Sequence, residues 1–312
     1  MSLLIRSSRK DFGMPCLEDC LSLPAPPGTP MTSQAVARPS CPSTSVGFTH
    51  RILTASLLTM GLVAPAAYAK SPATSTEGAS ELTIGAGAAV MPRYLGSDER
   101  RVIPLPVVAW KSGRYFADII RGVGVEHQTQ SGLYLSAALG YDMGRTTRNS
   151  TWQPGSKKLA GMGEVRESTT LDLIVAHPIT PWLSVNAEAE VKLFGQRDRG
   201  NQYRFGLHSD LRDDETDTIS LDVNAHLADS DYAKTYFGVS AKQSEQSGFA
   251  RHDAGSGLYG YSLTGTWTHS FNSHYSITTA VNVMQLTGDA GRSPLVKEKT
   301  AVTGMASLNY TF

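Results

Sequence analysis

Along residues 81–312, apolar and polar side chains alternate with a period of two, in segments of about ten residues that end in turn-forming residues. In the segment 183–193 every odd position is apolar, whereas Asn186, Glu188 and Lys192 are among the even positions. Side chains that alternate in this way lie on opposite faces of a β-strand. No stretch beyond residue 80 keeps the i, i+3, i+4, i+7 spacing of an amphipathic helix over three turns. The sequence therefore predicts an all-β chain.

Three all-β architectures compete for this pattern: a propeller, a sandwich and a membrane barrel. A propeller requires a repeat of about 40–50 residues, and the sequence has none. The expected strands exceed the five or six residues that are usual in a sandwich and approach the length that crosses a bilayer at a tilt. Connections 178–181 and 271–274 are tight, whereas 144–163, 228–255 and 288–297 are long and polar. This alternation is typical of a bacterial outer-membrane barrel.

Twelve strands are expected in this barrel, and their even number returns both ends of the sheet to the periplasm. They cover residues 82–90, 102–111, 114–119, 121–128, 132–143, 164–177, 182–194, 202–211, 216–228, 257–270, 275–287 and 298–312. In hydrocarbon every backbone N–H and C=O must be paired within the protein, so we expect the first strand to close against the twelfth.

The alternation also assigns the two faces of the wall. Trp182, Trp267 and Phe271 flank the tight turns on the predicted lipid face, where an interfacial aromatic girdle belongs. The last strand ends in Tyr310 and Phe312, and an aromatic end of this kind resembles the signal read by the barrel-assembly machinery. Residues with charges of both signs should face the lumen, which favours a cross-linked interior over a wide single-sign pore. They are Asp142, Asp172, Glu188, Glu190, Lys192, Arg204, His208, Asp222 and His226.

The N-terminal residues 1–69 are expected to lie outside the barrel. Arg51 precedes a short apolar run, which is followed by Ala67-Tyr-Ala69. A positive flank, a short apolar region and an A-x-A site together make a secretory signal peptide. We therefore predict a signal core at 51–69 that is cleaved after Ala69.

This cut divides the chain into three parts. Residues 1–69 comprise an over-extended N-terminus, for which Met31 is an alternative start, and the signal peptide. Residues 70–80 form a short periplasmic segment, and 81–312 form the barrel. All three cysteines precede the cut, so the mature chain offers no disulfide and no thiol chemistry.

The charge balance excludes one large class of partner. The 312 residues include 28 basic and 28 acidic side chains, without a basic cluster. A nucleic-acid-binding protein presents such a cluster, so no nucleic-acid partner is expected. Charged residues make up 18% of the chain, below the proportion of about 25% that is usual for soluble proteins.

Few residues suggest catalysis or ligand binding. The histidines lack the spacing of a zinc site, and the glycines at 85–87 and 122–124 lack the third glycine and the helix of a nucleotide loop. His274 and Ser276 would share one strand face, as in a lipid hydrolase, but they adjoin a tight turn without a carboxylate. The acidic turn 213–217 has oxygen ligands for calcium but no glycine pivot. We predict a protein that is not an enzyme and that has no metal and no cofactor.

Short motifs occur in order along 82–312. They are Gly85-Ala-Gly87, Pro92-Arg-Tyr94-Leu-Gly96-Ser97, Pro104-Leu-Pro106, Trp110-Lys-Ser-Gly-Arg-Tyr-Phe116, Arg121-Gly-Val-Gly124, Tyr236-Phe-Gly-Val-Ser240 with Ser247-Gly248, and Leu286-Thr-Gly-Asp289-Ala with Ser293-Pro294-Leu-Val296. In this order they resemble the MipA/OmpV family; the middle of the chain, 144–215, matches only in pattern.

The resemblance implies a protein of the Gram-negative cell outer membrane, named for its interaction with a murein lytic transglycosylase. It implies a scaffold that joins this hydrolase to a murein synthase, and it supplies no catalytic residue. The expected partners are outer-membrane lipid, the barrel-assembly machinery, a lytic transglycosylase and a murein synthase. A small-solute channel and a surface adhesin remain open as alternatives.

Overall fold

The computed structural model describes residues 80–195 and 197–312, so the predicted signal peptide, with Ala67 and Ala69, lies outside the described residues. The described residues form twelve strands: β1 (Ser80–Pro92), β2 (Arg100–Ser112), β3 (Tyr115–Asp118), β4 (Gly122–Gln128), β5 (Tyr134–Asp142), β6 (Ser168–Thr180), β7 (Leu183–Gly195), β8 (Gln202–Asp213), β9 (Asp217–Ala228), β10 (Gly257–Ser270), β11 (Tyr275–Leu286) and β12 (Thr300–Thr311).

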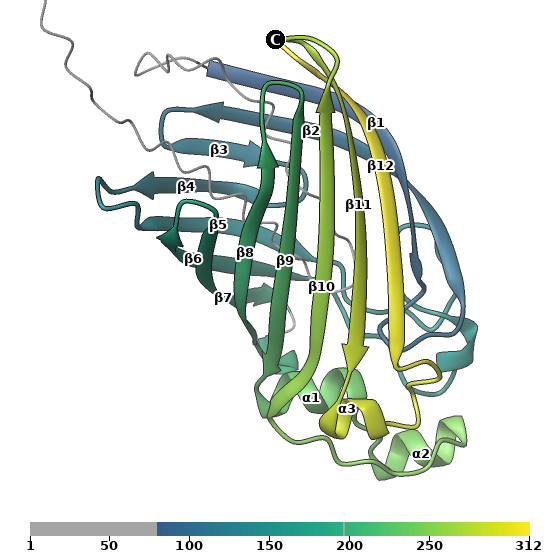
Figure 1. Cartoon of the computed structure of the whole chain (residues 1–312). Coiled ribbons are helices and arrows are strands. Elements are labelled where there is room, and N and C mark those ends of the chain that lie inside the picture. The colour runs from purple at the N-terminus through teal and green to yellow at the C-terminus, as the bar shows by residue number, and fades with distance from the viewer. Residues whose placement is uncertain (1–79, 196) are drawn as a thin grey trace, which may run out of the picture. The chain divides into compact units, whose positions relative to one another are not determined.

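The strands form one closed antiparallel barrel in chain order (Figure 1). Each strand pairs with the next along the chain, and the ring is completed by β1 and β12, whose register runs from Thr83 opposite Thr311 to Val90 opposite Gly304. The predicted fold, a twelve-stranded closed barrel, is confirmed. The predicted closure of the first strand on the last is confirmed as well.

One predicted turn is shorter than the sequence indicated. The sequence indicated a tight turn at 178–181, but β6 continues to Thr180 and the reversal lies at Pro181 and Trp182. The register of β6 with β7 shifts between Pro178 and Thr180. Proline lacks the N–H that a regular ladder requires, and a register irregularity accommodates it inside a strand.

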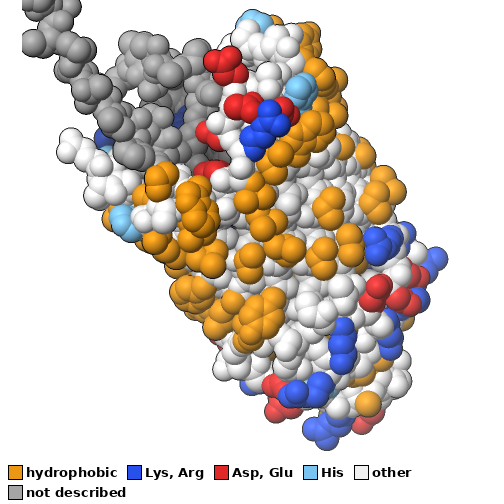
Figure 2. Space-filling model, in the orientation of Figure 1, with side chains coloured by type: hydrophobic (Ala, Val, Ile, Leu, Met, Phe, Trp, Pro, Cys, Tyr) orange, Lys and Arg blue, Asp and Glu red, His pale blue; other side chains and the backbone are white. Residues whose placement is uncertain are grey.

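The outer surface of the barrel is apolar. Alternate side chains around the wall are exposed, for example Val102 at 62%, Phe205 at 54% and Val281 at 54%. Figure 2 shows hydrophobic side chains in a broad band, with charged side chains gathered at the two ends. An apolar band of this kind is the surface that an outer-membrane barrel presents to lipid. None of the helices in residues 80–195 and 197–312 is long and apolar enough to cross a membrane.

The two ends of the barrel differ. One end carries the tight turns and the C-terminus, and exposed aromatic side chains surround it: Trp110, Tyr115, Trp182, Trp267, Phe271, Tyr275 and Phe312. The opposite end carries the long connections and the helices α1 (Ser230–Phe237), α2 (Ala241–Ser247) and α3 (Gly288–Arg292), together with the 3₁₀ turns η1 (Lys157–Leu159) and η2 (Arg197–Arg199) (Figure 1).

These helices have local causes that the period-two pattern did not reveal. Asp229 caps α1 by accepting a hydrogen bond from the backbone N–H of Tyr232. Ser240 and Gln243 form a reciprocal capping box at α2, which ends at Gly248 in the left-handed conformation. Each helix has at most eight residues, so none sustains a helical hydrophobic pattern long enough to be recognised in the sequence.

The seam between β1 and β12 requires small residues. A Cβ added at Gly85 would lie 2.5 Å from the carbonyl oxygen of Leu308, and one at Gly87 would lie 2.1 Å from that of Ala306. Glycine permits this close backbone approach. A side chain at either position would therefore force β1 and β12 apart.

The assignment of faces can be tested at Ala187, which lies on the outward face of β7. The variant Ala187→Arg should lose about 2–4 kcal/mol of unfolding free energy, because it places a charge in the hydrocarbon in the middle of the lipid face. Ala187→Leu is the matched control, since it adds apolar volume at the same position and should cost little. Unfolding of both variants in lipid vesicles measures the difference, and equal costs would contradict the lipid-facing assignment.

Candidate functional site

The lumen gathers the charged residues that the alternation directed inward. Asp142, Lys192, Arg204, His208 and Asp222 are buried inside the barrel, and most other members of the predicted set are buried or half-buried there. This part of the site was predicted from the sequence because lumen and lipid residues alternate strictly along each strand. The structure adds the partners of these residues.

A four-residue ionic cluster lies near the loop end of the lumen. The Asp142 carboxylate, only 1% exposed, accepts a hydrogen bond of 2.7 Å from Lys192 Nζ and forms a second ion pair with Arg199. Lys192 also contacts Glu190. Two cations and two carboxylates therefore neutralise each other within the protein, as buried charges require. Arg199 comes from η2, and no sequence pattern indicates that this loop residue points inward.

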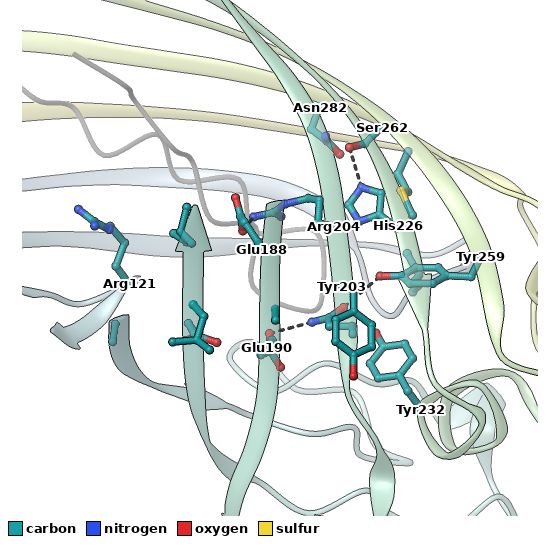
Figure 3. A pocket seen from close by; sticks show the side chains of 18 of the residues that line it. Arg121, Glu188, Glu190, Tyr203, Arg204, His226, Tyr232, Tyr259, Ser262 and Asn282 are labelled. Carbon is teal, nitrogen blue, oxygen red and sulfur yellow. Dashed lines mark hydrogen bonds and ion pairs between the residues drawn. The ribbon is translucent and has the colours of Figure 1, made fainter. Parts of the chain in front are cut away.

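Further ion pairs cross-link other parts of the wall. Glu188 of β7 and Arg204 of β8 pair across adjacent strands and face each other in Figure 3. His208 hydrogen-bonds Asp222 at 2.7 Å and Asp210 at 3.1 Å. Towards the tight-turn end, a third group contains Lys111, Arg121, Glu126 and Tyr134. The interior is thus bridged from several sides, as the mixture of charges predicted.

A pocket lies between these clusters (Figure 3). Gln202 connects its two sides, because its amide donates to Glu190 at 2.7 Å and its carbonyl accepts from the Tyr259 hydroxyl at 3.0 Å. His226 of β9 and Ser262 of β10 hydrogen-bond at 2.8 Å across neighbouring strands. The pocket is therefore lined by paired polar groups and by aromatic rings.

Aromatic side chains of helix α1 fill the loop end of this pocket. The rings of Tyr232 and Tyr236 lie 4.5 Å apart, and Tyr259 lies 5.7 Å from Tyr232 and from Phe237. Burial raises the pKa of Tyr232 and of Tyr236 well above the ordinary value, so both phenols are neutral. Arg145 anchors the helix by donating to the carbonyl oxygen of Tyr236 at 2.9 Å. These aromatic residues were not predicted to enter the lumen, because 228–255 has the composition of a long polar connection.

In the described residues, neither histidine–serine pair has the geometry of a Ser-His-Asp triad. His226 and Ser262 are in contact, but in the described part of the chain no hydrogen bond or ion pair joins His226 to a carboxylate. A nucleophilic triad needs such an orienting group. His274 and Ser276, the pair considered from the sequence, are not brought together: His274 Nδ1 contacts the Thr311 carbonyl at 2.9 Å, whereas Ser276 is buried in the lumen.

The acidic turn between β8 and β9 is held by its own hydrogen bonds. Asp214 accepts from the backbone N–H groups of Asp217 and Thr216 and from Arg212. These bonds, that of Asp217 foremost, lower the pKa of Asp214 below its ordinary value. Within residues 80–195 and 197–312, no group of three or more His, Cys, Asp or Glu side chains is arranged to hold a metal ion.

The C-terminal strand ends in an aromatic cluster at the tight-turn end. Tyr310 stacks on His274 at 5.5 Å and meets Tyr275 and Phe312 edge-on at 4.9 and 4.8 Å. Phe312 is 64% exposed, and its backbone N–H donates to Leu82 of β1 at 3.0 Å. The last residue therefore takes part in closing the barrel while its ring faces outward.

A closed wall, an outward apolar band and an ion-paired interior define an outer-membrane-type β-barrel. Residues 84–312 match the family model described as MltA-interacting protein MipA, and the chain belongs to this family. The resemblance inferred from the sequence motifs is confirmed. The family and the fold are typically non-enzymatic. No match was found among curated proteins.

Solved structures with some likeness to the chain are also outer-membrane proteins. The Ralstonia pickettii toluene transporter TbuX has 12% identity and a TM-score of 0.34, over 81% of this chain and 96% of that one. The NanC porin has 9% identity and a TM-score of 0.35, over 74% and 99%. The Acinetobacter baumannii channel DcaP has 8% identity and a TM-score of 0.34, over 75% and 97%. Scores below 0.5 do not define a common fold, so the architecture depends on the strand pairing of the chain itself.

The ionic cluster at the loop end should contribute strongly to stability. Asp142→Asn removes the carboxylate shared by Lys192 and Arg199 and leaves buried positive charge, which should cost about 3–5 kcal/mol of unfolding free energy. Asp98→Asn, at the exposed ion pair with Lys158, is the control and should change the unfolding free energy little. Urea unfolding in vesicles measures both, and a small effect at Asp142 would contradict the assigned network.

Proposed function

We propose that the protein is an outer-membrane scaffold that binds a lytic transglycosylase of the murein machinery. Membership of the MltA-interacting protein family carries this proposal, since the family name itself specifies such a partner. A murein synthase would be the second enzyme that the scaffold binds. The proposal requires a rigid barrel with an accessible periplasmic end, and it requires no catalytic residue.

The tight-turn end is the end that meets the partner in this proposal. Export by a signal peptide cleaved after Ala69 would leave a mature chain that begins at Lys70 and enters the barrel at Ser80. Both termini of the barrel lie at the tight-turn end, which is then periplasmic, and the turns 113–114, 129–133 and 271–274 are presented there. N-terminal sequencing of the envelope-extracted protein checks the mature start.

The filled interior favours a scaffold over an open channel. The ion pairs cross-link the wall, and the rings of Tyr232, Tyr236 and Tyr259 pack together at the loop end. A general pore keeps an aqueous lumen of wider diameter. Since the lumen residues stabilise one another, their role in this proposal is to keep the barrel rigid.

The proposed partner can be identified by capture. The detergent-solubilised mature barrel should retain a purified MltA-type lytic transglycosylase, and a short Gly/Ser insertion between Gly113 and Arg114 should weaken the binding if this turn contributes. The same insertion after Arg251, in the long β9–β10 connection at the opposite end, is the control and should have no effect. Binding that is lost only in the Arg251 variant, or absent from the unmodified barrel, would contradict the proposal.

We also propose that Phe312 is the signal for barrel assembly. It is the aromatic end of the last outward face, with its ring exposed beside Tyr310. Phe312→Asp should lower the amount of heat-modifiable barrel in the outer membrane, whereas Phe312→Tyr should restore it because the aromatic ring is kept. Undiminished assembly of the aspartate variant in cells would contradict this role.

A further inference from the structure

The wall of the barrel is incomplete between β2 and β5. Along β2, the short strand β3 pairs only with residues Ala109–Ser112. On the other side of the β3–β4 hairpin, the ladder of β4 with β5 ends at Val123 opposite Leu139. In the part of the chain that the structure describes, residues 100–107 of β2 therefore have a strand beside them on the β1 side only. Figure 1 shows β2 continuing well beyond the end of β3.

Two prolines lie on this open edge. The carbonyl oxygen of Val108 accepts a hydrogen bond from Ile119 at 3.1 Å, so Val108 directs its polar backbone groups towards the β3–β4 hairpin. Alternate residues of an antiparallel strand point to the same neighbour. Pro104 and Pro106 therefore point to the open side, where they contribute no N–H. An added strand could not pair regularly with this edge, and the opening is a consequence of the sequence itself.

The open edge covers the depth of one membrane leaflet. Trp110 of β2 lies in the aromatic ring at the tight-turn end. From Val108 to Arg101 a rise of about 3.3 Å per residue gives about 23 Å along the strand. With a strand tilt of about 35–45° this corresponds to about 16–19 Å of depth, close to half of a hydrocarbon core of about 30 Å. Because Val108 lies two residues from Trp110, the edge begins near the periplasmic interface in the proposed orientation and extends past the middle of the bilayer.

An apolar path leads through the wall at this place. A pocket at the tip of the β3–β4 hairpin is lined by the outward-facing Val108 and the exposed Ile119, and also by the inward-facing Leu105 and Met305. Because side chains of both faces line it, the pocket connects the outer surface with the interior. It is continuous with an apolar cluster against which Ile120 packs. The members of this cluster are Ala89, Met91, Ile103, Leu105, Ala280 and Met305.

A buried cation lies at the loop end of the same edge. Arg101 is 5% exposed; it donates to the Thr151 carbonyl at 3.3 Å and reaches the Met91 sulfur at 3.6 Å, while its Nε has no partner. The neighbouring Arg93 also has a buried nitrogen without a partner. Within residues 80–195 and 197–312, neither guanidinium forms an ion pair.

The carboxylates nearest to Arg101 in the sequence are engaged elsewhere. Asp98 and Glu99, in the connection between β1 and β2, both pair with Lys158, and Glu99 also accepts a hydrogen bond from Ser156. A buried charge without a counter-ion is costly. Arg101 is therefore suited to receive an anion from outside the chain, and a guanidinium binds carboxylate or phosphate with good geometry.

We propose that the lateral window, defined as the open edge 100–107 of β2 beyond the tip of the β3–β4 hairpin, binds an anionic amphiphile from the surrounding membrane. The acidic headgroup pairs with Arg101, and the acyl chain lies along Ile103 and Leu105 towards the hairpin tip. The membrane is the source of the ligand because the window opens on the lipid-facing surface. This binding is independent of the scaffold function, since it uses the opposite end and the wall of the barrel.

Binding of palmitate to the mature barrel in a neutral detergent tests the headgroup contact. Arg101→Gln should weaken palmitate binding at least tenfold, and Arg101→Lys should recover part of it because the charge returns. Hexadecanol, which has the same chain without a charge, should bind the unmodified and Arg101→Gln barrels equally. Arg148→Gln, at a side chain that is 77% exposed in a long connection, is the control for charge alone. Equal palmitate affinity of the Arg101→Gln and unmodified barrels would overturn the proposal.

Two further measurements keep the test independent of the stability of the Arg101 variant. Inorganic phosphate should displace palmitate only weakly, because it lacks the acyl chain; displacement at equal concentration would mean a simple anion site and would overturn the amphiphile assignment. In phosphatidylcholine vesicles that carry a maleimide on an acyl chain, Leu105→Cys should react, whereas Thr264→Cys should not. Both side chains are buried and inward-facing, but Thr264 lies behind a wall paired on both sides. Equal reactivity would show that no lateral window exists.

Discussion

The structure depends on one constraint, which is that a strand in hydrocarbon must find its backbone hydrogen-bond partners within the protein. In the described residues, the edge of β2 at Pro104 and Pro106, where two N–H donors are missing, is the exception. A sheet meets this requirement only by closing, and β1 against β12 is the pairing that closes it. Closure in turn fixes two surfaces, because each strand turns alternate side chains to lipid and to the lumen. The even strand number then places both ends of the sheet together and assigns tight turns to one end and long connections to the other.

The lumen follows from the same closure. Side chains that face inward are removed from both lipid and bulk water, so their charges have to be neutralised by one another. Asp142, Lys192, Arg199 and Glu190 do so as one group, and Glu188 does so with Arg204. The loop end is then closed by the aromatic rings of α1, which pack next to this ionic group. A narrow barrel of this kind is a rigid body with two chemically different ends.

Much of this architecture was predictable, because alternation reports directly on strands and faces. The segment 183–193 identified β7 and its inward charges, and the outline of all twelve strands followed from similar patterns. The turn predicted at 178–181 is shorter, because β6 continues through Pro178 to Thr180 with a shift of register. Arg199 and the tyrosines of α1 could not be assigned to the lumen, because their positions depend on how connections fold back over the barrel. The unpaired edge at Pro104 was likewise hidden, since single-strand patterns do not reveal which neighbour is missing.

The seam between the first and last strands has a kinetic consequence. The hydroxyl groups of Thr83 and Thr311 meet at 2.9 Å although 228 positions separate them in the chain. Contacts between such distant segments form late, because the entropy of closing a long loop must be overcome before they stabilise anything. The hairpins from β6 to β11 can form from neighbouring segments, whereas β1 has to keep an unsatisfied edge until β12 arrives. We therefore expect ring closure to be the slow step of folding. Until it occurs, the unpaired edge of β1 is the part of the chain most prone to pair with a wrong strand.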